Sequence, residues 1–111
     1  MVTQTLAQEV SQLEADLCFA LADSNRILIL YALAEKSRNV TEITNELNIT
    51  QPTASRHLKI LRERGLAHTE RSGTTIIYHL SDRRLIDALD ILRSVLRDRL
   101  AHRASLMEEI E

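Results

Sequence analysis

A mainly α-helical fold with one small β-hairpin is what the sequence predicts, and three observations support it. Apolar residues recur every three or four positions near both ends of the 111-residue chain and in its middle, which is the period of an amphipathic helix. Between residues 66 and 80 the period changes to the alternation of strands, and Gly73 interrupts it as a hairpin turn would. The expected order is four helices, two strands and a last helix in a single domain, residues 1–111.

The first half of the chain carries two predicted helices. The first covers about residues 3–22, and the second covers residues 25–36 after a cap at Asp23 or Ser24. The segment 27–30 is apolar on nearly every side, so we expect the second helix to be central and buried. One apolar stripe marks the first helix, formed by Leu6, Val10, Leu13, Leu17 and Leu21.

Two short helices joined by a tight turn follow, over residues 40–47 and 51–64. Thr50 is suited to cap the second of them, and Pro52 falls in its first turn, where a missing N–H is harmless. Gly65 is typical of a helix end. These dimensions are those of a helix-turn-helix. The residues expected to face the core are Ile43, Leu47, Ala54, Leu58 and Leu61.

The alternating segments 66–70 and 75–80 predict two strands, with a turn at residues 71–74. Ser81 or Asp82 is suited to cap a last helix over about residues 82–108. A hairpin after a helix-turn-helix indicates a winged helix-turn-helix. The last helix has its own apolar stripe, formed by Leu85, Leu89, Leu92, Leu96 and Leu100.

Positive charge is concentrated in one part of the chain. The whole sequence has a net charge of −2, yet residues 51–84 hold seven basic and three acidic residues. The segments on both sides are net acidic. A phosphate backbone attracts such a basic segment, while the acidic remainder limits indiscriminate binding.

The helix at 51–64 is therefore expected to enter the major groove of duplex DNA, as the second helix of this motif does. Glutamine can pair with adenine and arginine with guanine, while serine, threonine and lysine suit phosphates or either base. The hairpin tip is expected to reach a neighbouring phosphate or the minor groove. The candidate DNA-binding residues are Gln51, Thr53, Ser55, Arg56 and Lys59 on the helix, and Arg71, Thr74 and Thr75 at the tip.

Several other classes of protein are disfavoured. There is no phosphate loop and no convergent catalytic set, so we expect neither an enzyme nor a cofactor. No apolar stretch approaches the roughly 20 residues that cross a bilayer, and no signal peptide begins the chain, so we expect a cytoplasmic protein. A single-stranded nucleic-acid binder needs exposed aromatic rings, but Phe19 and Tyr31 are expected to be buried.

The stretch from Gln51 to Leu58, followed by Leu61-Arg62 and Gly65-Leu66, resembles the recognition helix of the ArsR/SmtB family. The resemblance extends over about residues 17–82, with Ser24 where the family usually has proline. It implies a dimeric bacterial repressor with a winged-helix fold. Such a dimer would bind an inverted repeat, block polymerase and leave when an inducer favours another conformation.

The resemblance also implies two metal sites, and the matching positions here do not fit either of them. The cysteine site falls on Asn39, Thr41 and Thr44, none of which is a thiolate. The site on the last helix would fall on Asp82, Arg84, Val95 and Asp98, where both imidazoles are missing. We therefore expect no metal sensing at these sites.

Three further residues or pairs are weaker candidates for a signal. Cys18 could be oxidised, although a small buried core residue is the favoured interpretation for a free cysteine. Asp98 and His102 lie four residues apart, which favours a solvated surface pair over a metal site. His57 is expected to pack or to contact a phosphate.

The stripes on the first and last helices exceed what one small core needs. We expect residues 3–22 and 82–108 of two chains to bury them against each other in a homodimer. Two alternatives stay open: a redox-responsive repressor acting through Cys18, and a winged helix that binds protein instead of DNA. The identity of an inducer is not predicted.

Overall fold

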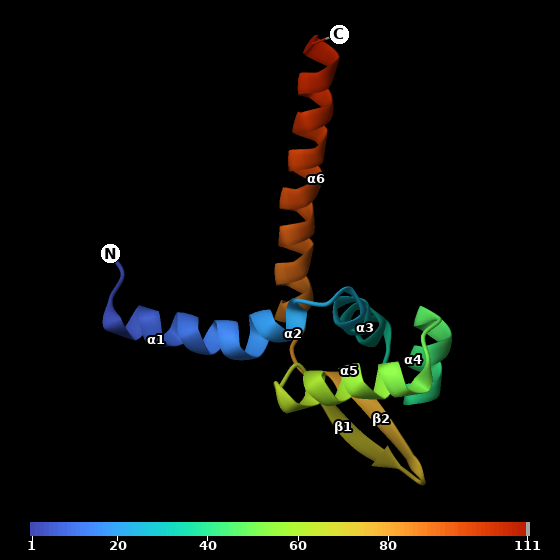
Figure 1. Cartoon of the computed structure of the whole chain (residues 1–111). Coiled ribbons are helices and arrows are strands. Elements are labelled where there is room, and N and C mark those ends of the chain that lie inside the picture. Colours follow the sequence, from blue (N-terminus) through green and yellow to red (C-terminus); the bar gives the residue numbers. More distant parts are fainter. Residues whose placement is uncertain (111) are drawn as a thin grey trace.

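The computed structural model describes the backbone of residues 1–110 and the side chains of residues 1–109. Its elements are α1 (Gln4–Leu13), a π-helical turn η1 (Glu14–Cys18), α2 (Phe19–Leu21), α3 (Ser24–Glu35), α4 (Val40–Leu47), α5 (Gln51–Glu63), β1 (Ala67–Ser72), β2 (Thr75–Leu80) and α6 (Arg84–Ile110). The predicted order is confirmed. In Figure 1 the middle elements form a body, from which α1 and α6 project in different directions.

The core lies where α3, α4, α5 and the start of α6 meet. The predicted core residues Ile43, Ala54, Leu58 and Leu61 are fully buried, while Leu47 packs against them partly exposed. The expectation for α3 is only partly right. Ile29 and Leu30 are buried, but Leu28 is 52% exposed, because an apolar run longer than one helix face must leave a residue outside.

Three side-chain caps fix the starts of the central helices. Asp23 accepts from the backbone N–H of Asn25 and Arg26, at 2.8 and 3.3 Å, and is therefore the cap of α3. Asn39 and Glu42 form a reciprocal capping box at α4. Thr50 caps α5 through the N–H of Thr53, as predicted.

The turn of the hairpin is shorter than predicted. Ser72 pairs with Thr75, so two residues, not four, connect the antiparallel strands, and β1 extends to Ser72. Gly73 has a φ of +64°, whereas no positive φ occurs at Thr74. A glycine at the first turn position is what a type II′ hairpin requires. Downstream, Asp82 accepts from the N–H of Arg84 at 2.9 Å, where α6 begins.

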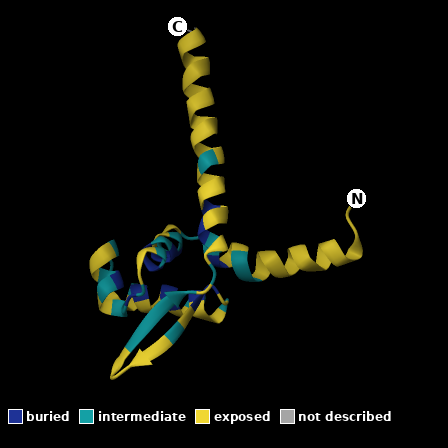
Figure 2. Cartoon of the chain, turned by 180° about the vertical axis from the view of Figure 1, so that it is seen from behind, coloured by how far each residue is buried: buried dark blue, intermediate teal, exposed yellow. Residues whose placement is uncertain are grey.

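The N-terminal helix is interrupted, which the sequence did not predict. A π-helical turn at residues 14–18 separates α1 from α2. No residue of α1 or η1 is buried, and only Ala20 is buried in α2 (Figure 2). Leu17 and Leu21, beyond the start of the turn, pack against the core, while Leu6, Val10 and Leu13 stay exposed.

The apolar stripe of α6 is divided in the same way. Ile86 and Leu89 join the core near the start of the helix. Farther along α6, the exposed apolar residues are Ile91, Leu92, Val95, Leu96, Leu100, Leu106 and Met107.

No single described helix is long and apolar enough to cross a membrane. The bent pair formed by residues 4–21 and α3, with an angle of 85° between its halves, would be long and apolar enough by length and composition alone.

Candidate nucleic-acid interface

The outer face of α5 carries the side chains that the sequence singled out. Ala54, His57, Leu58 and Leu61 bury the inner face of this helix. The outer face holds Gln51, Ser55, Arg56 and Lys59, which are exposed, and Thr53, which is half-buried. The five predicted residues of α5 therefore share one solvent-facing side of a single helix.

Two of these side chains have partners within the chain. The hydroxyl of Thr53 accepts from that of Thr50 at 2.9 Å. Lys59 lies 3.9 Å from Glu63, and the two side chains are 68% and 55% exposed. An exposed pair of this kind contributes only about 0–1 kcal/mol, so Lys59 can turn to another anion.

His57 holds α5 against the start of α3. Its side chain is buried, and its Nδ1 lies 3.3 Å from Nη1 of Arg26. Arginine can only donate, so Nδ1 accepts and the ring proton lies on Nε2, which is 3.8 Å from Asp23. Of the two expected roles, packing is the one this geometry supports.

The charge state of this cluster follows from its surroundings. Burial lowers the pKa of His57, and the charges of Arg26 and Arg56 act in the same direction against the opposing effect of Asp23. Partial burial acts to raise the pKa of Asp23, but the backbone N–H donors of Arg26 and Asn25 outweigh it and leave that pKa lowered. The cluster therefore favours a neutral histidine between a cation and an anion.

The other predicted DNA-binding residues lie at the tip of the hairpin. Arg71, Thr74 and Thr75 are all exposed there (Figure 2). The hairpin runs alongside α5, and its tip points toward the side of the molecule where α5 begins (Figure 1). The tip is thus set apart from α5, toward the end of the molecule at which that helix begins (Figure 1).

Sequence reasoning missed the buried arginines. Arg38 is 6% exposed and donates to the carbonyl of Ala32 at 3.0 Å and to the carboxylate of Glu35 at 2.8 Å. Its backbone also pairs with Tyr78 of β2. Arg38 therefore ties the hairpin to the end of α3. Composition alone gives no signal for such a residue, since arginines are mostly exposed.

Two expectations about the N-terminal helix are wrong for the single chain. Cys18 is exposed, so it is not a buried core residue. Phe19 is 46% exposed, so it is not buried either, and its ring lies beside the guanidinium groups of Arg64 and Arg26, with centroid distances of 4.5 and 5.6 Å. In α3, Tyr31 was also expected to be buried, but it is only half-buried, and its hydroxyl donates to Asp90 at 2.6 Å.

The positions matching the two family metal sites are engaged in other contacts or exposed. Asn39 caps α4, and the hydroxyl of Thr44 donates to the carbonyl of Thr41 at 2.6 Å. Arg84 donates to both oxygens of Asp82 and lowers the pKa of that carboxyl to about 2. Among the described residues, no group of three or more histidine, cysteine, aspartate or glutamate side chains is placed to hold a metal ion. Val95, Asp98 and His102 are all exposed on α6.

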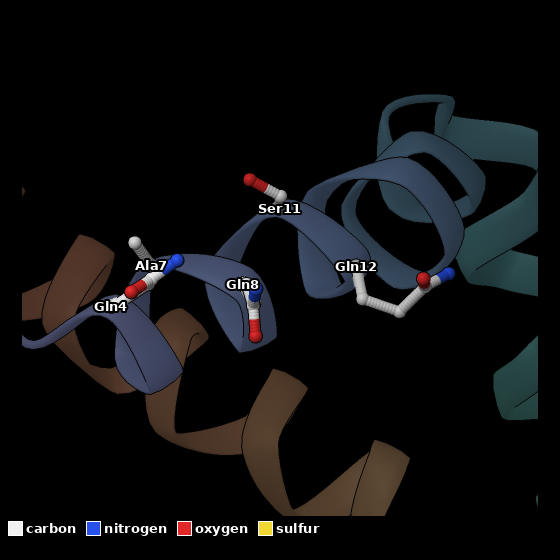
Figure 3. Close-up of a pocket in the computed structure, with 5 residues that line it drawn as sticks. All are labelled: Gln4, Ala7, Gln8, Ser11 and Gln12. Atoms are coloured by element: carbon white, nitrogen blue, oxygen red, sulfur yellow. The ribbon is translucent and has the colours of Figure 1, made fainter.

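The hollow drawn in Figure 3 follows a single helix. Its lining residues are Gln4, Ala7, Gln8, Ser11 and Gln12, all on the polar side of α1. None of the five carries a charge or a reactive thiol, and all are exposed. It is an open surface of one helix and offers no arrangement for chemistry.

Comparison with known proteins agrees with this geometry. The family model of the bacterial regulatory proteins of the arsR family matches residues 23–69. The HTH-type transcriptional repressor SmtB of Mycobacterium tuberculosis is 40% identical over 78 residues, covering 70% of this chain and 58% of its own length. An uncharacterised HTH-type regulator of Methanocaldococcus jannaschii is 35% identical over 79 residues, covering 70% of this chain and 89% of its own.

A solved structure shares the architecture. The homodimeric winged helix-turn-helix DNA-binding domain of a Mycobacterium bovis protein superposes with a TM-score of 0.76 at 28% identity, covering 91% of this chain and 93% of that one. The predicted fold class is therefore confirmed. The matched proteins are named as transcriptional repressors and regulators, not as enzymes. With its helix-turn-helix, hairpin and recognition-helix sequence, the chain belongs to the ArsR family of bacterial regulatory proteins.

Proposed function

We propose that this protein is a transcriptional repressor that binds an inverted-repeat operator as a homodimer. The observation that carries the proposal is the outer face of α5, where polar and basic side chains are exposed on a helix whose inner face is buried. Arg56 and Gln51 have the donor pattern to read guanine and adenine in the major groove. The tip residues Arg71, Thr74 and Thr75 would contact the adjacent backbone or minor groove.

The homodimer would form through the terminal helices of a single winged-helix domain. Support comes from the exposed apolar residues of α1 and α6, which have no partner surface on the body of the described chain. A contiguous apolar stripe on a projecting helix is unfavourable in water and is typical of a protein interface. The homodimeric state of the Mycobacterium bovis domain supports the same arrangement.

Repression would be steric: a dimer on the operator blocks polymerase and acts in the cytoplasm, where a bacterial chromosome lies. Release requires a ligand that binds the two conformations unequally, with about 1–3 kcal/mol of coupling. The engaged side chains at Asn39, Asp82 and Arg84 favour a signal other than metal at the two family sites.

Duplex binding tests the proposal. A random duplex library is selected with the purified protein, and the enriched duplex is used in mobility-shift assays. Arg56→Ala/Lys59→Ala should abolish the shift. The control Lys36→Ala/Arg97→Ala removes the same two charges from exposed positions outside α5 and should keep it.

Two outcomes would favour other functions. A wild-type protein that enriches no duplex at low salt would contradict the repressor and favour a protein-binding winged helix. Loss of binding with a thiol oxidant, absent in Cys18→Ser, would make the repressor redox-responsive.

A further inference from the structure

The N-terminal helix is attached to the body mainly through polar contacts. Leu17 and Leu21 are only partly buried, and Ala20 is the single buried residue between Gln4 and Leu21. So few apolar contacts leave the direction of α1 weakly determined by packing. Other interactions must therefore fix the angle at which α1 leaves the body.

The π-helical turn supplies the acceptors for such interactions. A π-helical turn breaks the usual bonding of a helix and leaves backbone carbonyls available. The carbonyl of Ala15, inside η1, accepts from Nη1 of Arg64 at 2.7 Å. Directly after the turn, in α2, the carbonyls of Phe19 and Ala20 accept from Arg26 at 3.1 and 2.7 Å.

Arg64 is the residue that ends the recognition helix. It is the C-cap of α5, and its side chain reaches back 49 residues along the sequence to η1. The guanidinium lies over the ring of Phe19, at 4.5 Å from the centroid, and Nη1 is 3.5 Å from the carboxylate of Asp16. A backbone bond, a ring contact and an ion pair together fix one direction for this side chain.

Arg26 provides a second connection, from α2 to the middle of α5. Its Nε and Nη2 hold the carbonyls of Ala20 and Phe19, while Nη1 lies against Nδ1 of His57. The ring of Phe19 thus lies beside two arginines. Arg64 is at the end of α5, and Arg26 contacts His57 in the middle of α5. Both Arg64 and Arg26 donate as cations, and hydrogen bonds from a charged donor are stronger than those between neutral groups.

We propose that Arg64 is a positioning residue that sets the operator spacing this repressor accepts. This inference rests on the proposed function. If α1 contributes to the dimer interface, the angle between α1 and α5 determines how far apart the two recognition helices lie. Arg64, with Phe19 and Arg26, fixes that angle at the π-helical turn, so it determines specificity without touching DNA.

Two measurements test the inference, with Arg64→Ala as the variant and Arg62→Ala as the matched control. Arg62 is an exposed arginine two residues earlier on α5, so its loss removes the same charge and leaves the contact with η1 intact. The first measurement is hydrogen exchange of the amides in residues 14–19. Exchange there should be faster in Arg64→Ala than in wild type or Arg62→Ala.

The second measurement compares the affinity for the selected inverted repeat with the affinities for duplexes whose spacer between the half-sites is one base pair shorter or longer. Wild type and Arg62→Ala should discriminate among spacers. Arg64→Ala should lose about tenfold on the selected spacer, from the loss of a charged hydrogen bond, and nothing on the changed ones. Arg64→Lys, which keeps the charge but not the planar contact with Phe19, should be intermediate.

Unchanged exchange, or intact discrimination in Arg64→Ala, would overturn the inference. A wild-type protein that binds no inverted repeat would instead contradict the proposed function and, with it, the role in spacing. The exchange experiment would still show whether Arg64 fixes η1.

Discussion

Substituting Lys59 by alanine should change how steeply DNA binding depends on salt. Three of the exposed residues proposed to contact DNA are basic in each protomer: Arg56 and Lys59 on α5 and Arg71 at the hairpin tip. A dimer would then neutralise about six phosphates, which gives a slope of log K against log salt of about −5.4. Lys59→Ala removes two of the six contacts, so the slope should fall to about −3.6.

The difference is large enough to measure. Between about 50 and 200 mM salt, wild type should lose roughly a thousandfold in affinity and Lys59→Ala roughly a hundredfold. The weak pair between Lys59 and Glu63, at 3.9 Å, should not obscure this effect, because both side chains are more than half exposed. Fluorescence anisotropy with a labelled duplex over a salt series gives both slopes.

Lys36→Ala is the matched control, since Lys36 is the other lysine of the sequence and is exposed after the end of α3. Its slope should equal that of wild type. An unchanged slope in Lys59→Ala, or an equal decrease in Lys36→Ala, would refute the placement of Lys59 against phosphate.

Three other predictions concern stability and assembly. Asn39→Ala should lower the free energy of unfolding by about 1 kcal/mol in urea denaturation, because it removes the capping box of α4, whereas Asn45→Ala, inside the same helix, should not. The free energy of unfolding should fall as pH decreases below 6.5, since burial lowers the pKa of His57 and only the unfolded chain gains that proton; a His57→Gln variant that shows the same pH dependence would contradict this. Leu96→Glu should weaken the dimer at least about a hundredfold in analytical ultracentrifugation, from about 1.5–3 kcal/mol of lost burial in each protomer, and an unchanged dimer would exclude this face.

Local signals explain why most of the fold was predictable. Caps are set by a few neighbouring residues, so the sequence alone placed the start of α5 at Thr50 and that of α3 at Asp23 or Ser24, of which Asp23 is the cap. The helical period of apolar residues predicted which residues of α5 are buried, and the other residues of the helix were therefore predicted to face solvent. The resemblance of residues 51–66 to a family motif identified the same helix independently.

The errors arise where distant residues decide. No pattern of neighbouring residues predicted the turn η1. The arginine that donates to its Ala15 carbonyl, Arg64, lies 49 residues farther along the sequence. Phe19 was expected to be buried, but its ring is 46% exposed and lies beside two arginines, one of which is 45 residues away in the sequence. An apolar stripe in the sequence also does not indicate whether the same chain or a second chain buries it. Cys18 and the stripe of α6 are both exposed in the single chain.

Hydroxyl-radical footprinting of the purified protein on its selected duplex tests the central claim most directly. A dimer with one α5 in each half-site should protect two segments related by symmetry and centred about one helical turn, roughly 10 base pairs, apart. Arg56→Ala/Lys59→Ala should remove both. A single protected segment, or protection that survives the double substitution, would contradict the account of a dimer that reads DNA through α5.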